Sequence, residues 1–341
     1  MNEKVHGAEP PLLGDRYGRL GRFHTYVTGE RATARAAILE IVEASPVIDV
    51  PCLCGATDED QLLAGIDRWG LPCRQILCNA CGLIRSSPRW LDDTFTTIYA
   101  KHFWPLQSGS REISSNRFQL SLERSKPFYH RLQQLPLKNK NVCEIGCSYG
   151  TGLFHVKSDT KRIVGYDWDT SILKIGKEMT GLDLRHGGVE AAVADNPQGY
   201  DIVILRHVVE HFLSPLKEIQ NLHRLLAPGA RLVIEVPGVF NSSEFSPDPL
   251  GFFNAFHTFS FSLKTLTELM HRCGFRCVYG DEIVFSIWEA STLPPKANPQ
   301  NGREEAAKIL SALRQYEKRR QFDQSVLGKA WQRMRKTFRV G

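Results

Sequence analysis

Short apolar runs separated by polar stretches of helical length occupy the second half of the 341-residue chain. The runs expected to form strands are residues 142–145, 162–166, 182–184, 201–205 and 231–236. Strands that alternate with helices in this way pair in parallel, because each crossover helix returns the chain to the same edge of the sheet. The pattern therefore predicts an α/β fold with a mostly parallel sheet covered on both faces.

Two further apolar runs, 276–279 and 283–287, follow a helical stretch at 263–273. Only residues 280–282 separate the two runs, and a connection this short joins antiparallel neighbours. We therefore expect one antiparallel strand in the otherwise parallel sheet.

The first half of the chain shows helical patterns around a cysteine-rich segment. Helices are expected at 30–44, from Asp92 or Asp93 to about Ala100, and at 115–135. The last of these has its apolar residues on one side, so we expect it to pack on the α/β domain.

These patterns divide the chain into five parts. They are an N-terminal arm and helix (1–49), a cysteine-rich module (50–90), a helical connector or lid (91–140), the α/β domain (141–290), and a linker with a basic helical tail (291–341). Residues 291–302 are rich in proline, asparagine and glycine, which is typical of linkers, so we expect the tail to be separate.

Composition narrows the class of protein. With 42% hydrophobic and 23% charged residues, the chain is neither collagen-like nor wholly disordered. It has no apolar run long enough to span a membrane, and its first ten residues are too charged for the core of a signal peptide. We therefore expect a cytoplasmic protein.

The net charge of +6 is unevenly distributed. From Arg303 onward there are 11 basic and 4 acidic residues, so this segment carries +7 and the rest of the chain carries −1. A basic tail of this kind suggests a partner that bears phosphate groups.

Four of the nine cysteines form two close pairs, Cys52 with Cys54 and Cys78 with Cys81. Each pair is followed by glycine, and Zn²⁺ prefers a tetrahedron of four thiolates. The first pair has one intervening residue instead of two, so Cys73 is an alternative ligand. A closed site of this type is structural, because it leaves no position open for a substrate.

The first strand of the predicted sheet runs into the glycine-rich sequence EIGCSYGTG, from Glu144 to Gly152. The acid at the strand end favours a ligand with a cationic amine, and the glycines allow that ligand to approach the backbone closely. The second strand ends at Asp167, where a carboxylate can accept both hydroxyls of a ribose. Two acids and a glycine turn therefore describe a site for a nucleoside joined to an amino acid.

From residue 141 to 287 the chain resembles the class I S-adenosylmethionine-dependent methyltransferases, which have a Rossmann-like sheet. The later markers of that family are similar too: YDIVI at 200–204, HVVEHF at 207–212, LLAPGA at 225–230, and the segment 257–275. The resemblance implies S-adenosylmethionine as cofactor. It places the methionine end at Glu144 and Gly146, within the turn that Gly150 and Gly152 complete, and the ribose at Asp167. It places the adenine at Val189 or Glu190.

Residues 52–100 resemble an N-terminal module found in bacterial methyltransferases. The matching parts are CLCG at 52–55, DRWGLPCR at 67–74, CNACGLI at 78–84, and the pairs at 88–89 and 99–100. The module usually has valine where this chain has Cys73. The resemblance therefore implies that Cys52, Cys54, Cys78 and Cys81 are the ligands and that Cys73 is a core thiol.

Methyl transfer to a hydroxyl needs a base, and His257, His211, His207 and Glu210 are the candidates because ligands bind at the carboxyl ends of such strands. A packed or solvated side chain is the competing interpretation for each histidine, and Glu210 can instead cap a helix near Ser214. Some related methyltransferases bind a divalent metal through a similar E..EH motif. The same four residues can hold Mg²⁺, although His207 replaces the first glutamate.

Three functions remain, in order of preference. The first is O-methylation of a sugar, glycan or natural product, with C- or N-methylation of a small molecule as a variant. The second is RNA methylation, in which the zinc module and the basic tail would bind the RNA, although acidic residues dominate the module. The third is a non-catalytic subunit that binds S-adenosylmethionine.

Overall fold

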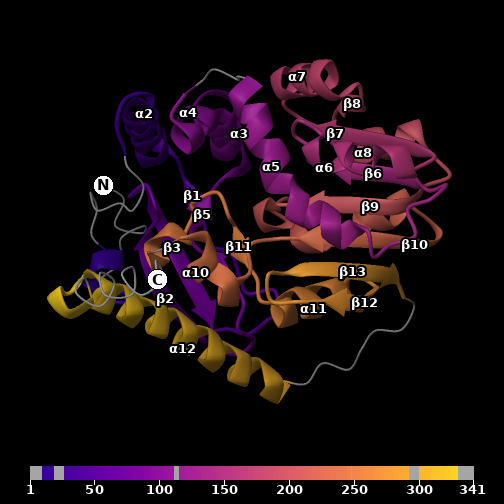
Figure 1. Ribbon diagram of the computed structural model, residues 1–341. Helices are drawn as coiled ribbons and strands as arrows, with labels where there is room; N and C mark the ends of the chain where they lie inside the picture. The colour runs from indigo at the N-terminus through magenta and orange to yellow at the C-terminus, as the bar shows by residue number, and fades with distance from the viewer. Residues whose placement is uncertain (1–9, 19–26, 111–114, 247, 292–298, 329–341) are drawn as a thin grey trace, which may run out of the picture. The chain divides into compact units, whose positions relative to one another are not determined.

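The computed structural model describes residues 10–18, 27–110, 115–246, 248–291 and 299–328 (Figure 1). Expectations for residues 1–9, for most of the linker and for 329–341 lie outside the described residues. The chain forms two compact units. The first comprises Met1–Gly109, Gly238–Thr265 and Asn298–Gly341, and the second comprises Ser110–Pro237 and Leu266–Ala297.

A seven-stranded sheet forms the centre of the second unit, in the order β12-β13-β10-β9-β6-β7-β8. The strands are β6 (Asn141–Ile145), β7 (Arg162–Asp167), β8 (Asp183–His186), β9 (Tyr200–Arg206), β10 (Leu226–Glu235), β12 (Phe275–Gly280) and β13 (Phe285–Ala290). Strand β13 runs antiparallel to both of its neighbours, and all other pairs are parallel. The predicted α/β sheet with one antiparallel strand is therefore confirmed.

The last strand begins later than predicted because its turn is longer. The carboxylate of Asp281 accepts hydrogen bonds from the amides of Ile283 (3.1 Å) and Phe285 (3.2 Å). Val284 adopts a left-handed backbone with a φ of 59°, so residues 281–284 form the turn. Residues 283 and 284, predicted as strand, belong to this turn.

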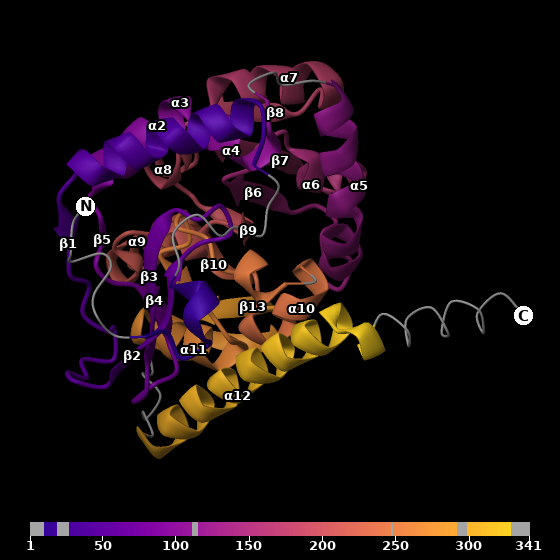
Figure 2. The ribbon, with the colours of Figure 1, turned by 90° about the vertical axis from the view of Figure 1, so that its left-hand side faces the viewer.

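Helices flank the sheet of the second unit. They are α5 (Ser115–Leu132), α6 (Thr151–Phe154), α7 (Thr170–Thr180), α8 (Val189–Asp195), α9 (Pro215–Asn221) and α11 (Leu263–Arg272), whose first turn groups with the other unit. Helix α5 ends at Leu132, three residues earlier than predicted. It lies beside α6 (Figure 2), and Phe128 and Leu132 share a core with Val142 of β6. The expectation that this helix packs on the α/β domain is confirmed.

The first unit contains a four-stranded antiparallel sheet in the order β11-β4-β3-β2. Its strands are β2 (Asp60–Ile66), β3 (Pro72–Cys78), β4 (Ile84–Ser86) and β11 (Phe259–Ser260), with β1 (Val47–Ile48) and β5 (Arg89–Trp90) as a separate pair. Its helices are α2 (Glu30–Ala44), α3 (Asp92–Lys101), α4 (Phe103–Ser108), α10 (Ser242–Phe245) and α12 (Pro299–Gln324). The helices predicted at 30–44 and from Asp92 are present.

Packing groups the segments differently from the five parts expected from the sequence. Gly238–Thr265 was expected within the α/β domain but belongs to the first unit. Its Ala255 amide donates to the buried carboxylate of Asp67 (3.2 Å), and the Arg68 amide donates to the Phe253 carbonyl (3.0 Å). The hairpin between β2 and β3 thus binds this segment through its own turn.

Helix α12 was expected as part of a separate tail, and it packs instead along the first unit. Ile309 and Leu313 are buried in a core shared with Leu63 of β2. The carboxylate of Glu317 accepts hydrogen bonds from Arg16 (2.8 Å) and Tyr17 (2.6 Å). These contacts close the unit between its first and last described segments. Across the described ranges, no helix is long and apolar enough to cross a membrane.

Candidate active site

The glycine turn after β6 depends on residues without side chains. Gly146 has a φ of 73°, and a Cβ atom there would lie 2.5 Å from Cγ2 of Val208. The amides of Gly146 and Cys147 donate to the carbonyl of Tyr166 on β7 (2.7 and 3.0 Å). Gly150 is left-handed as well and precedes α6, which includes Gly152. The turn therefore lies against the carboxyl end of the neighbouring strand.

Glu144 lies in β6, two residues before Gly146, with only 1% of its surface exposed. Among the described residues, neither carboxylate oxygen has a hydrogen-bond partner, and Nε of Arg206 lies 3.9 Å from Oε1. Burial raises the pKa of Glu144 to about 7, although Arg206 opposes the shift. A buried carboxylate without hydrogen bonds is costly, so it suits a cationic group that arrives with a ligand.

Asp167 ends β7, the strand beside β6. Its Oδ2 accepts the Ser148 amide from the glycine turn (2.8 Å), and its Oδ1 accepts the Asp169 amide (3.0 Å). Burial raises the pKa of Asp167. The two backbone bonds fix the carboxylate in place and leave further lone pairs for hydroxyl donors.

Trp168 is a residue that the sequence analysis missed. It directly follows Asp167, and its side chain is 73% exposed. It meets His186 of β8 edge to face, with ring centroids 5.3 Å apart. The sequence already shows this aromatic residue next to a strand-end acid. Its ring offers a flat apolar surface beside the polar site, so the position could have been selected from the sequence.

Val189 and Glu190 begin α8, just after β8. Because β8 follows β7 in the sheet, these residues lie on the same side of the unit as Asp167. Val189 is half-buried, whereas the exposed Glu190 pairs with Arg224 at 2.6 Å. The structure therefore leaves Val189 the better placed of the two for an apolar contact with a base.

His207 follows β9 with a strained left-handed backbone, at a φ of 56°. Its Nδ1 lies 3.4 Å from Oε1 of Glu210, and its Nε2 lies 3.8 Å from Oε1 of Glu235. Burial lowers the pKa of His207, but Glu210 and Glu235 outweigh that effect and raise it. Glu235 was missed, although it ends β10 and Glu144 lies one residue before the end of β6.

Glu210 and His211 belong to a short 3₁₀ helix, Val209–His211. Glu210 is buried, and its Oε1 lies 4.0 Å from Nε2 of His211. The carboxylate of Glu218 accepts the Ser214 amide (2.8 Å) at the start of α9. Glu218, and not Glu210, therefore caps the N-terminus of α9.

His257 lies in the first unit, where its amide donates to the Asn254 carbonyl (3.0 Å). Its own carbonyl accepts a hydrogen bond from the Ser86 hydroxyl (3.3 Å). Glu210 and His211 belong to the second unit, so the predicted grouping of His257 with them stays a prediction.

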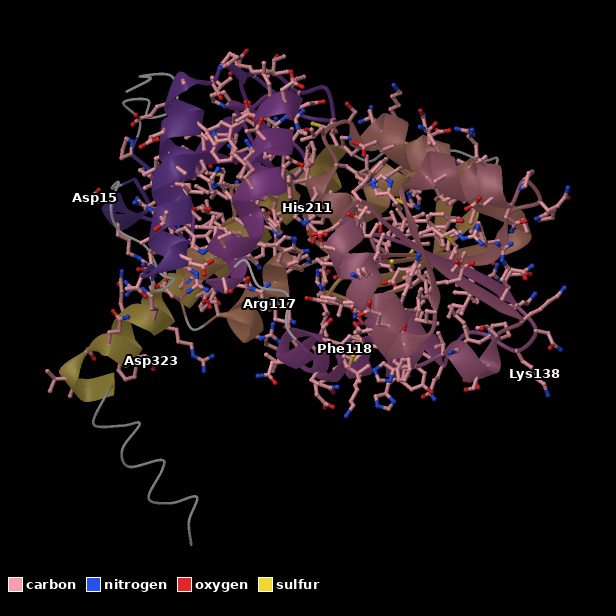
Figure 3. All side chains as sticks on the ribbon, turned by 90° about the horizontal axis from the view of Figure 1, so that it is seen from above. Asp15, Arg117, Phe118, Lys138, His211 and Asp323 are labelled. Carbon is pink, nitrogen blue, oxygen red and sulfur yellow. The ribbon has the colours of Figure 1, made fainter. Side chains whose placement is uncertain are left out.

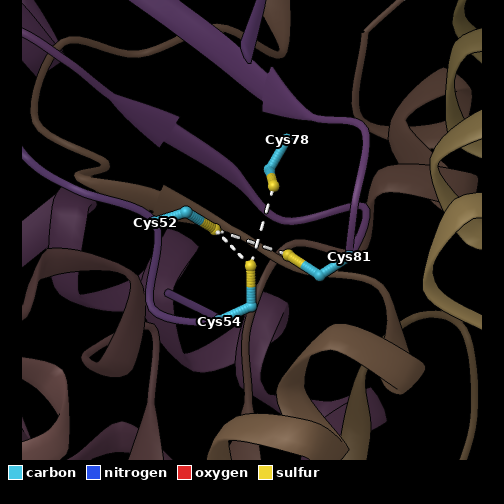
Figure 4. Close-up of side chains that lie close together, drawn as sticks. All are labelled: Cys52, Cys54, Cys78 and Cys81. Carbon is cyan, nitrogen blue, oxygen red and sulfur yellow. Dashed lines mark hydrogen bonds between the residues drawn. The ribbon is translucent and has the colours of Figure 1, made fainter. Parts of the chain in front are cut away.

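The four paired cysteines converge in the first unit (Figure 4). Sγ of Cys52 lies 3.4 Å from Sγ of both Cys54 and Cys81, and Cys54 lies 3.8 Å from Cys78. All four sulfur atoms are within 4.8 Å of one another. A zinc ion with bonds of about 2.3 Å to a tetrahedron of thiolates requires sulfur atoms about 3.8 Å apart. The donor set therefore fits zinc.

Cys73 lies outside this cluster. Its buried sulfur accepts a hydrogen bond from Nε2 of Gln75 (2.9 Å), and burial raises the pKa of Cys73 to about 12. Hydrogen bonds from Cys52 and Cys81 instead lower the pKa of Cys78. Cys73 thus packs in the core apart from the four paired cysteines, which favours those four as the ligand set.

The sheet order and the acids at its carboxyl edge define a Rossmann-like methyltransferase fold. Residues 117–279 match a family model described as a methyltransferase domain, which covers the sheet from β6 to β12. The chain therefore carries a class I S-adenosylmethionine-dependent methyltransferase domain.

A probable S-adenosylmethionine-dependent methyltransferase from Mycolicibacterium smegmatis is 29% identical over 138 residues, covering 40% of this chain and 52% of the relative. The ubiquinone biosynthesis O-methyltransferase of Nitrosospira multiformis is 26% identical over 98 residues, covering 27% and 41%. The chain thus spans about half the length of the curated relatives it matches. Magnesium protoporphyrin IX methyltransferase from Synechocystis PCC 6803, solved with bound SAH, is 15% identical, covers 58% of this chain and 99% of that one, and has a TM-score of 0.41.

Proposed function

We propose that this protein transfers the methyl group of S-adenosylmethionine to a hydroxyl group of a small molecule such as a sugar, a glycan or a natural product. The observation that supports cofactor binding best is the buried carboxylate of Glu144 beside a glycine turn, which has no hydrogen-bond partner in the part of the chain that the structure describes. An amine is the complement of such a group. Asp167 on the next strand accepts the ribose hydroxyls, and Val189 with Trp168 contacts the adenine.

S-adenosylmethionine, when bound, supplies a methyl group on a sulfonium that is already a good leaving group. The protein's task is to align an acceptor and exclude water. His207 lies between the carboxylates of Glu235 and Glu210, and each of its ring nitrogens faces one of them, so neither nitrogen is directed to an acceptor hydroxyl. His257 and His211 remain the preferred bases for the acceptor hydroxyl, and a Mg²⁺ ion at the same residues is the less favoured mechanism.

We also propose that the cysteine cluster holds a structural zinc ion. All four positions of a tetrahedron are taken by Cys52, Cys54, Cys78 and Cys81, which leaves none for a substrate. The zinc would fix the loop before β2 to the turn after β3, which together form one end of the first unit.

Asp167→Ala is expected to weaken the binding of S-adenosylmethionine and of its demethylated product at least about tenfold, or about 1.4 kcal/mol, because the ribose hydroxyls lose their acceptor. Isothermal titration calorimetry measures the change. Asp159→Ala, which alters an exposed acid of the same unit, should leave the affinity unchanged. Tight NAD binding by the unchanged protein, with no binding of S-adenosylmethionine, would contradict the proposal.

The affinity for S-adenosylmethionine is expected to fall as the pH is lowered, because burial raises the pKa of Glu144 to about 7 in the free protein. Below that pH the carboxyl group is protonated and cannot pair with an amine. The loss approaches about tenfold for each pH unit well below the pKa. Glu144→Gln should bind weakly at every pH and show no such dependence. If the affinity of the native protein is the same at about pH 8 and at about pH 6, Glu144 does not bind the amine of S-adenosylmethionine.

A further inference from the structure

A positively charged side chain lies beside the buried carboxylate of Glu144. Glu144 is opposite Ile204 in the parallel pairing of β6 with β9, and Arg206 follows Ile204 by two positions. Residues two positions apart in a strand point to the same face of a sheet. Glu144 and Arg206 therefore share one face, near the carboxyl ends of neighbouring strands.

The guanidinium of Arg206 is held at a distance from that carboxylate. Its Nε lies 3.9 Å from Oε1 of Glu144, which is too long for a hydrogen bond. Its Cζ lies 5.2 Å from the ring centre of Phe128 on α5, within the range of a cation–π contact. Figure 3 shows α5, whose first turn carries the labelled Arg117 and Phe118. The buried ring of Phe128 thus supports the guanidinium from the helix side.

Arg206 has more hydrogen-bond donors than the described chain uses. A guanidinium carries five N–H donors in a planar fork. The side chain of Arg206 is only 16% exposed, and it donates no hydrogen bond to any residue that the structure describes. Within the same residues, neither carboxylate oxygen of Glu144 accepts one. Two groups of opposite charge are therefore available to a ligand side by side.

Gly152 leaves both charged groups accessible. A Cβ atom at this position would lie 3.5 Å and 3.6 Å from the two carboxylate oxygens of Glu144, and 3.7 Å from Cζ of Arg206. Any side chain here would therefore contact the acid and the arginine together. Glycine keeps the start of α6 clear of both groups.

Building on the proposed use of S-adenosylmethionine, we propose that Arg206 binds the carboxylate at the methionine end of this ligand while Glu144 binds the amine. The ammonium and carboxylate groups of an α-amino acid are attached to one carbon atom, so they match an acid and a guanidinium that lie side by side. The arginine fork can donate two parallel hydrogen bonds to a carboxylate. Arg206 is thus a specificity-determining residue that selects a nucleoside joined to a complete amino acid.

The competing role for Arg206 is that of a counterion for Glu144 alone. Burial raises the pKa of Glu144, and Arg206 opposes that shift. A counterion of this kind would affect every ligand with an amine to the same degree. An arginine that binds the ligand's carboxylate discriminates between ligands with and without one. The two roles are therefore separated by removing the carboxylate from the ligand.

Isothermal titration calorimetry of the full-length protein with two ligands tests the assignment. S-adenosylmethionine carries both groups, whereas decarboxylated S-adenosylmethionine keeps the amine and the sulfonium but has no carboxylate. The native protein should bind the first roughly tenfold or more tightly than the second. Arg206→Gln should bind the two with nearly equal affinity. Arg206→Lys should keep part of the preference, because it retains the charge but not the fork.

Arg131→Gln is a matched control within the same unit. Arg131 also lies over an aromatic ring, that of Phe285, and it pairs with Asp281 at 3.0 Å. This variant should keep the native preference. Binding of 5′-methylthioadenosine, which lacks the whole amino acid, should be the same in the native protein and in Arg206→Gln, which shows that the variant retains its nucleoside site.

The assignment of Arg206 is overturned if Arg206→Gln keeps the native preference, or if it weakens the binding of both ligands equally. Equal affinity of the native protein for the two ligands would overturn it as well. In each of these cases S-adenosylmethionine still binds the native protein, so the proposed function stands. If the native protein binds neither S-adenosylmethionine nor its demethylated product, the proposed function itself fails.

Discussion

Cys78→Ser or Cys81→Ser is expected to remove the metal from the cysteine cluster and to lower the melting temperature of the first unit sharply. Structural zinc contributes an apparent binding free energy of about 10–16 kcal/mol, which is available to folding only while all four thiolates are present. The four sulfur atoms lie within 4.8 Å of one another, so the loss of one leaves the tetrahedron open. Elemental analysis should find about one zinc per native chain, and calorimetry measures the change in melting temperature.

Cys73→Ser is the matched control for this experiment. Its thiol is buried in the same unit but lies outside the cluster and accepts a hydrogen bond from Gln75. Serine can accept the same bond, so the zinc content should stay at the native value. The ligand assignment is wrong if Cys73→Ser empties the site while Cys52→Ser retains the metal.

His257→Ala and His211→Ala are expected to lower turnover by about 10²- to 10⁴-fold if one of these histidines is the general base, while the affinity for S-adenosylmethionine stays nearly constant. His257 is the first choice because a loop residue can adjust its approach to the acceptor, and His211 is the second. His207 is held between Glu210 and Glu235, so His207→Ala should have a smaller effect on the proton-transfer step. Single-turnover kinetics with saturating cofactor separate this step from binding.

A different outcome would favour the metal-assisted mechanism. Activity would then survive each histidine change, disappear with a chelator and return with Mg²⁺ or Mn²⁺. Because a chelator can also extract zinc from the cysteine cluster, the melting temperature must be followed in the same samples. A loss of activity without a fall in melting temperature identifies the second metal.

Local patterns were sufficient to predict the sheet and the acids at its edge. Apolar runs and helical spacing are properties of neighbouring residues, so they placed strands β6 to β9 within two positions, whereas β10 begins at Leu226 and not at the predicted residue 231. The rule that ligands bind at the carboxyl ends of parallel strands then selected Glu144 and Asp167. The same rule also selects Glu235, which ends β10. It would likewise have drawn attention to Trp168, the residue directly after Asp167.

The paired cysteines were equally visible, because their spacing is local. The sequence left open whether Cys73 was a ligand, since a CxC pair departs from the usual spacing. The fold decided that question by turning Cys73 toward Gln75 and bringing Cys52 and Cys54 to the opposite pair. Which thiols meet depends on the register of β2, β3 and β4, and residue spacing does not specify it.

The chain's sequence alone predicted an α/β methyltransferase sheet, the acids at its carboxyl edge and the two cysteine pairs. Tertiary structure decided which segments share a core. Gly238–Thr265 and α12 join the N-terminal unit through contacts such as Tyr17 with Glu317, which are 300 positions apart. Such pairings arise because a buried apolar face or a buried charge needs a complementary partner, which can lie anywhere along the chain. The hydrophobic periodicity of a segment identifies its own apolar face but not the segment that packs against it.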